Sequence, residues 1–252
     1  LTRYSVCVRN IKDLRYHLER GFYEAHAGRP GPVWIEIPQD LQYATLDPEK
    51  LEGFQPPHTD SQNEVKQGVS RANELFDLIT AAKRPLLWVG NGIRLAGAEK
   101  DLERTLDLLQ IPSLVAWNGT DLLTDDHPLY AGRAGVSGQR GANFALQNCD
   151  LLIALGTRLA IPQIGYSQDE VARAAKKVVV EIDPHEITKW KKAPDLVVQG
   201  DVGQFLRSLN EIFAQKKRTW NFSEWIERCH QWRKDYPVCL PEYKNLPPGK
   251  IN

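Results

Sequence analysis

The sequence of 252 residues has no methionine, no closely spaced pair of cysteines and no long apolar run. Its four cysteines form no C-x-x-C motif, and a chain of this size holds a core without disulfides, so we expect a reducing compartment: the cytoplasm, or an organelle in a eukaryote. No two of the six histidines are four residues apart, so no metal site is expected. No apolar run approaches the roughly 18 residues of a membrane span, and no signal peptide is visible, so no membrane partner is expected.

An excess of either charge is also missing, since Lys and Arg total 32 and Asp and Glu total 32. Binding nucleic acid or an anionic membrane surface needs clustered positive charge, so neither kind of partner is expected. The sequence begins at Leu1 without a methionine, which predicts a processed product or a part of a longer chain.

The first segment of note is GRPGPVWIEIPQD, residues 28–40, where two glycines and two prolines precede a short apolar run. Apolar residues at helical spacing predict a helix over about 11–27, which the prolines then end. Val33–Ile37 is predicted to be a strand. About 45 residues are too few for a core of their own, so residues 1–44 should dock on a larger body. The polar, proline-bearing residues 45–63 are interpreted as a linker.

Strands alternate with helices from residue 64 onward. Each predicted strand is a continuous apolar run, which is typical of a parallel sheet covered on both faces. The sequence therefore predicts an α/β fold, a doubly wound and mostly parallel Rossmann-like sheet, preceded by a partial α/β segment. Strands are expected at 86–89, 113–117, 151–155, 177–182 and 196–198, helices at 64–82, 97–109, 140–148, 168–176 and 202–215, and a Trp-rich helix with a Pro-rich tail in 217–252.

Two glycine-bearing segments are candidates for the sheet edge where ligands of such folds bind, beyond the carboxyl ends of the strands. In VGNGI, residues 89–93, a phosphate could approach the backbone, or the glycines could simply form a tight turn. The second segment, AGVSGQRGAN at 134–143, offers three glycines before a helix and hence an anion site. Its G-V-S-G-Q order differs from the G-x-S-x-G nucleophile elbow, so a serine hydrolase is not expected.

Charged residues follow two further strands. Gly156-Thr157-Arg158 places an arginine where it could pair with a phosphate or form a surface salt bridge. In Glu181-Ile182-Asp183, a carboxylate could accept hydrogen bonds from ribose hydroxyls or an adenine amine, while Asp183 could instead cap a helix. No acid/base pair or activated nucleophile accompanies these groups, so the residues predict binding of a nucleotide-like cofactor and no catalysis of their own.

The order of GRPGPVWIEIPQD, KRPLLWVGNGI, GANFALQNCDLLIALGTRL, VVVEIDPHEI and VVQGDV resembles the acetohydroxyacid (acetolactate) synthase group of thiamine-diphosphate-dependent enzymes. The resemblance makes residues 1–44 the end of a pyrimidine-binding domain, 64–216 a central domain, and 217–252 a link toward a diphosphate-binding domain. It implies a homo-oligomeric enzyme that decarboxylates a 2-keto acid such as pyruvate. Thiamine diphosphate and Mg²⁺ would bind only the complete enzyme, so the isolated chain should be inactive.

In flavin-containing members of the group the central domain holds FAD, and other members bind ADP or nothing there. The resemblance implies that these residues contact the cofactor: Arg29, Gly90, Asn91, Gly92, Ile93, Trp117, Asn118, Ser137, Gly138, Gly156, Thr157, Arg158, Glu181, Ile182, Asp201 and Val202. Two other hypotheses stay open, a stand-alone module that binds NAD or FAD without catalysis, and a sirtuin-like NAD-dependent deacylase. The second would normally show paired zinc-binding cysteines.

Overall fold

The computed structural model describes residues 2–57, 61–240 and 243, with the backbone alone for 61–67. The chain divides into two compact units, Leu1–Ser61 and Gln62–Asn252. Each unit is described by itself.

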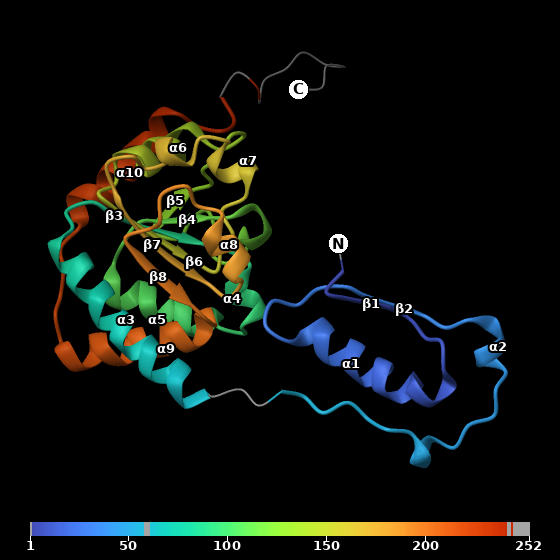
Figure 1. The fold of residues 1–252 in the computed structure, drawn as a ribbon. Coiled ribbons are helices and arrows are strands. Elements are labelled where there is room, and N and C mark those ends of the chain that lie inside the picture. Colours follow the sequence, from blue (N-terminus) through green and yellow to red (C-terminus); the bar gives the residue numbers. More distant parts are fainter. Residues whose placement is uncertain (1, 58–60, 241–242, 244–252) are drawn as a thin grey trace. The chain divides into compact units, whose positions relative to one another are not determined.

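The first unit is a helix beside a two-stranded parallel sheet (Figure 1). The expected helix and strand are confirmed, with one strand and several short turns in addition. Its elements are β1 (Tyr4–Cys7), a 3₁₀ turn (Ile11–Asp13), α1 (Leu14–His26), β2 (Val33–Glu36), α2 (Gln39–Gln42) and a second 3₁₀ turn (Pro48–Lys50).

The GRPGP segment reverses the chain between α1 and β2. Gly28 has a φ of +60°, a left-handed conformation that favours glycine. The guanidinium of Arg3 donates to the carbonyl oxygens of Glu24 and Arg29, at 3.0 and 2.9 Å. These contacts hold the turn against the start of β1, so the stiff segment sets the direction in which β2 runs.

The second unit contains a six-stranded sheet in which every neighbouring pair is parallel (Figure 1). This confirms the predicted fold class. From the central pair β3 and β6, successive strands are added outward in opposite directions, so the strand order reverses between these two strands. In spatial order the strands are β5 (Tyr130–Gly132), β4 (Ser113–Val115), β3 (Pro85–Val89), β6 (Leu151–Leu155), β7 (Lys176–Glu181) and β8 (Leu196–Gln199).

Helices cover both faces of this sheet, and all residues of β3 and β6 are buried between them. The covered strands explain why apolar runs rather than alternating patterns mark them in the sequence. One face carries α3 (Ser61–Ala81), α5 (Glu99–Leu109) and α9 (Val202–Lys216), and the other carries α6 (Arg140–Asn148) and α10 (Ser223–Asp235). Shorter helices follow three strands: α4 (Gly92–Leu95), α7 (Ile161–Ile164) and α8 (Pro184–Thr188).

One predicted element is wrong. The helix expected over 168–176 is a single 3₁₀ turn, Gln168–Glu170. Ala172 is fully buried with a φ of +44°, which a helix does not allow, and Ala175 is buried as well. The segment is thus held by burial of its small residues on the core, and this packing overrides its helical propensity.

The helix α10 lies in the segment interpreted as a link toward another domain. It packs on α6, and its Trp225 indole N–H donates to the carbonyl of Pro85 at 2.9 Å. Cys149 and Cys229 are buried, and desolvation raises the pKa of each thiol to about 12. Both thiols therefore stay protonated near neutral pH and act as packing groups. The assignment of 217–252 as a link stays a prediction.

Candidate functional site

The loops after β3 and β6 meet at the point where the strand order reverses. The N–H of Gly92 donates to the carbonyl of Gly156 at 2.8 Å, and that of Gly90 donates to Leu155 at 3.0 Å. A Cβ atom on Gly90 would lie 2.5 Å from the Gly156 carbonyl oxygen and 2.6 Å from the Cα of Thr157. These glycines therefore permit contact between the two loops, and the amides of Gly90 and Gly92 already have protein acceptors.

The neighbouring residues of the first loop differ in exposure. Asn91 and Gly92 are partly exposed, whereas Ile93 is fully buried in the core. The expected phosphate contact through the amides of Gly90 and Gly92 thus competes with existing hydrogen bonds. A side-chain contact from Asn91 stays a prediction.

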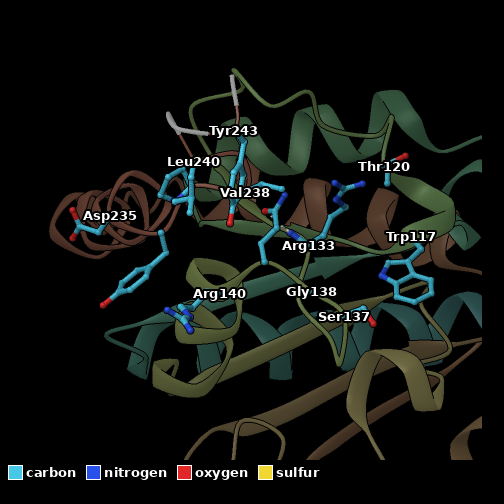
Figure 2. Close-up of a pocket in the computed structure, with 13 residues that line it drawn as sticks. Trp117, Thr120, Arg133, Ser137, Gly138, Arg140, Asp235, Val238, Leu240 and Tyr243 are labelled. Carbon is cyan, nitrogen blue, oxygen red and sulfur yellow. Dashed lines mark hydrogen bonds between the residues drawn. The ribbon is translucent and has the colours of Figure 1, made fainter. Parts of the chain in front are cut away.

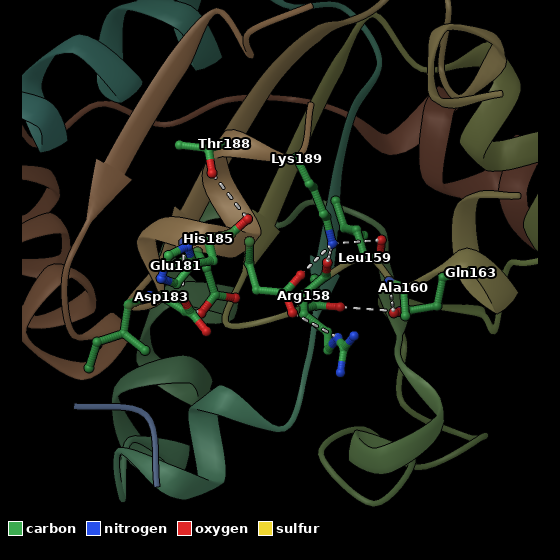
Figure 3. A network of polar contacts seen from close by, with 12 residues as sticks. Arg158, Leu159, Ala160, Gln163, Glu181, Asp183, His185, Thr188 and Lys189 are labelled. Carbon is green, nitrogen blue, oxygen red and sulfur yellow. Dashed lines mark hydrogen bonds and ion pairs between the residues drawn. The ribbon is translucent and has the colours of Figure 1, made fainter. Parts of the chain in front are cut away.

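Arg158 lies in the turn that follows β6 (Figure 3). The turn begins with Gly156 at a φ of +58°, and the buried Thr157 hydroxyl accepts a hydrogen bond from Gln163 Nε2 at 3.1 Å. The Arg158 side chain is 55% exposed, and its Nε lies 3.1 Å from Glu186 Oε1. The predicted salt bridge is thus present at this position.

Carboxylates follow β7 and β8. Glu181 is 7% exposed, and its Oε1 accepts the N–H groups of Ile182 and Asp183 at 3.0 and 3.1 Å. The Asp183 carboxylate accepts the His185 N–H at 2.9 Å. Asp183 therefore caps α8, which is one of the two alternatives that the sequence left open for this residue. Asp201 caps α9 in the same way, accepting the Gln204 N–H at 2.9 Å. Glu181 is therefore the buried carboxylate that the fold orients at this edge.

Val202 begins α9 directly after Asp201 and is buried. Trp117 is 47% exposed and Asn118 is exposed, and both lie in a 3₁₀ turn after β4, at the same carboxyl edge of the parallel sheet. Arg29 belongs to the first unit. Its predicted contact with a cofactor stays a prediction.

The loop 133–139 after β5 is held by Asn143, which our sequence analysis did not assign a role. The Asn143 side chain accepts from the N–H of Gly135 at 2.9 Å and donates to its carbonyl at 3.0 Å. A Cβ atom on Gly138 would collide with the backbone N of Gly135. The amide of Asn143 and the absence of a side chain at Gly138 together fix where Ser137 lies.

Trp117, Ser137 and Gly138 line a pocket of ≈ 760 Å³ beside α6 and α10 (Figure 2). That volume is in the range of small-molecule sites. Arg133 and Arg140 also line the pocket, and the Arg140 guanidinium lies 5.4 Å from the centre of the Tyr236 ring. Sequence reasoning missed both arginines, although Arg133 directly precedes the 134–143 segment and Arg140 lies within it.

Within the residues described here, no group of three or more His, Cys, Asp or Glu side chains is arranged to hold a metal ion. Across the same residues, no helix is both long and apolar enough to cross a membrane. The candidate site comprises the loops at the carboxyl ends of β3, β6 and β7, and a separate pocket toward α6 that polar and apolar side chains line together.

Most of the second unit matches a known protein family. Residues 72–209, more than half of the chain, match the family model described as "Thiamine pyrophosphate enzyme, central domain". The chain belongs to this family. Of the expected contact residues, the match contains all those from Gly90 to Val202, whereas Arg29 lies outside it.

The chain is also similar to curated proteins along nearly all of its own length. It is 32% identical to the acetolactate synthase isozyme 2 large subunit of Escherichia coli K12, over 94% of the chain and 41% of that protein. It is 35% identical to the acetolactate synthase large subunit of Parasynechococcus marenigrum, over 96% of the chain and 39% of that protein. The chain thus spans about two fifths of the length of these relatives.

Proposed function

We propose that the chain is the central portion of a thiamine-diphosphate-dependent 2-keto acid decarboxylase and carboligase that resembles acetolactate synthase. The proposal depends on the central-domain match and on relatives named acetolactate synthase that align along nearly all of the chain. Thiamine diphosphate, bound by the complete enzyme, would supply the electron sink for losing CO₂ from the keto acid. Mg²⁺ and assembly into a homo-oligomer are part of the same proposal.

Within this enzyme the second unit serves as a binding domain for an adenine nucleotide, as FAD or ADP. Two groups at the carboxyl ends of β6 and β7 suit such a ligand. The buried Glu181 carboxylate is oriented by backbone amides at the end of β7, where it can accept from ribose hydroxyls or an adenine amine. The exposed Arg158 guanidinium can hold a phosphate by two hydrogen bonds. The proposed role of both groups is to bind the ligand and not to take part in catalysis.

The observation that carries the nucleotide proposal is the meeting of the β3 and β6 loops where the strand order reverses, with Arg158 and Glu181 on adjacent strand ends. Ligands of parallel α/β sheets bind at this place. The two loops are hydrogen-bonded and closely packed through Gly92 and Gly156, so their relative position is fixed.

Calorimetric titration of the purified chain with ADP, FAD and NAD tests the nucleotide proposal. We expect ADP and FAD to bind with dissociation constants on the order of micromolar and NAD more weakly. Arg158→Ala should weaken ADP binding by about tenfold, because it removes a charge-assisted contact to phosphate. Arg173→Ala is the control, since that exposed arginine precedes the opposite end of β7. Absence of ADP and FAD binding, or equal losses in both variants, would overturn the proposal.

The enzymatic part is tested separately on the whole protein that contains this sequence. Release of CO₂ from pyruvate should require added thiamine diphosphate and Mg²⁺, and the isolated chain should release none. Turnover by the isolated chain would show that the active site does not depend on other domains. NAD binding without any keto acid turnover by the whole protein would favour the stand-alone module instead.

A further inference from the structure

The turn that presents Arg158 has a backbone conformation that needs support. Leu159, the next residue, has a φ of +47° and is 1% exposed. The left-handed region is uncommon for a bulky residue, and such conformations persist only where the surroundings enforce them. The structure should therefore contain groups that hold the backbone at Arg158 and Leu159.

Lys189, at the end of α8, provides that support (Figure 3). Its ammonium group donates to the carbonyl oxygens of Arg158 and Leu159, the second at 3.1 Å. The same group lies 2.6 Å from Glu186 Oε2. The Lys189 side chain is 25% exposed and that of Glu186 is 13% exposed, so these contacts are largely shielded from water.

Glu186 connects this clamp to Arg158. One carboxylate oxygen contacts Lys189, while the other lies 3.1 Å from the Nε of Arg158. The Arg158 side chain is 55% exposed, so the ion pair between Arg158 and Glu186 is weak, as exposed ion pairs are. A phosphate that binds the guanidinium through two hydrogen bonds makes a stronger contact than this single one.

We propose that Glu186 is a specificity-determining residue that occupies the Arg158 guanidinium until a phosphate replaces it, while Lys189 keeps Glu186 and the turn in place. The inference rests on the nucleotide binding proposed above and deepens it. A ligand without a phosphate has nothing to compensate the lost ion pair, so it cannot engage Arg158. Glu186 therefore lowers the affinity for ligands whose phosphate has to displace it from Arg158, and leaves unchanged the affinity for ligands that do not contact Arg158.

The test compares ADP and adenosine binding to the wild-type chain, Glu186→Gln and Lys189→Met by calorimetry. Glu186→Gln should raise ADP affinity by about two- to fivefold, the factor expected of an exposed ion pair, because Arg158 loses its competitor. Adenosine affinity should not change. Lys189→Met should lower ADP affinity, since the turn loses its support, and Lys189→Arg should restore part of it.

Controls are Glu170→Gln and Lys176→Met, which change the same charges at exposed positions before and at the start of β7. Thermal unfolding identifies any variant that does not fold, in which case Glu186→Asp, too short to span both partners, takes the place of Glu186→Gln. Unchanged or weaker ADP binding by a folded Glu186 variant overturns this inference alone, provided the wild type binds ADP. Absence of ADP binding by the wild type overturns both this inference and the nucleotide proposal.

Discussion

At the scale of single residues, the positions without side chains determine how closely the loops after β3 and β6 approach each other. A Cβ atom added to Gly90, Gly92 or Gly156 would stand within 3 Å of a backbone atom of the facing loop. Their amides and carbonyls also bond across the two loops. A methyl group here has no flexible neighbour to displace, because the contacting atoms are backbone atoms and the Cβ of Thr157.

Gly90→Ala is therefore expected to lower the free energy of unfolding by about 1–3 kcal/mol, the range for overpacked sites. Gly200→Ala is the matched control, because no atom lies within 4 Å of where its Cβ would stand. Urea unfolding of both variants and the wild type measures the difference. Equal stability of the two variants would show that the loops can separate without cost.

The sequence locates these glycines but does not reveal their partners. A G-x-G after a strand is compatible with a phosphate cradle and with a packed turn, and the choice depends on Gly156, which is distant in the sequence. The same holds for Arg158, whose partner Glu186 lies on another element. The sequence pattern therefore identifies the edge of the sheet and most side chains at that edge. It does not reveal the contacts within the protein, such as the ion pair of Arg158 with Glu186, with which any ligand competes.

At the scale of elements, hydrophobic runs were sufficient to predict β3, β4, β6, β7 and β8, and helical spacing predicted the helices that cover them. The strands that escaped prediction, β1 and β5, are short, and β5 ends in Gly132. The helix expected at 168–176 failed because packing of Ala172 and Ala175 outweighs local propensity. Tertiary contacts of this kind leave little trace in a single sequence.

The hydrogen bond that joins α10 to the sheet is expected to stabilise the fold. Trp225 is buried, and its indole N–H donates to Pro85 at the start of β3. Trp225→Phe should cost about 1–3 kcal/mol of unfolding free energy, because it leaves a buried carbonyl without its donor. Trp220→Phe is the control, since the buried Nε1 of Trp220 has no hydrogen-bond partner in the described structure. Unfolding in urea should rank Trp225→Phe as the less stable variant, and a reversed order would contradict the role of this bond.

At the scale of the whole molecule, the two units differ in how completely they bury their sheets. The six-stranded sheet is covered by helices on both faces, and β6 is buried along its whole length. In the two-stranded sheet every second residue of β1 and β2 is exposed. Large apolar side chains of the first unit are also exposed, Phe22 at 73%, Trp34 at 64% and Tyr43 at 81%. A two-stranded sheet of this size is marginal by itself in water.

Amide hydrogen exchange of the chain should therefore separate the units. We expect Val33–Glu36 of β2 to exchange at least about a hundredfold faster than Leu151–Leu155 of β6, because opening the small sheet exposes little apolar surface while opening β6 requires disrupting the main core. Both strands are paired in parallel, β2 with one neighbour and β6 with two. Mass spectrometry of peptides from both strands measures the ratio. Equal protection in β2 and β6 would show that residues 1–44 are as stable as the central sheet, and would remove the physical reason for expecting them to dock on a larger body.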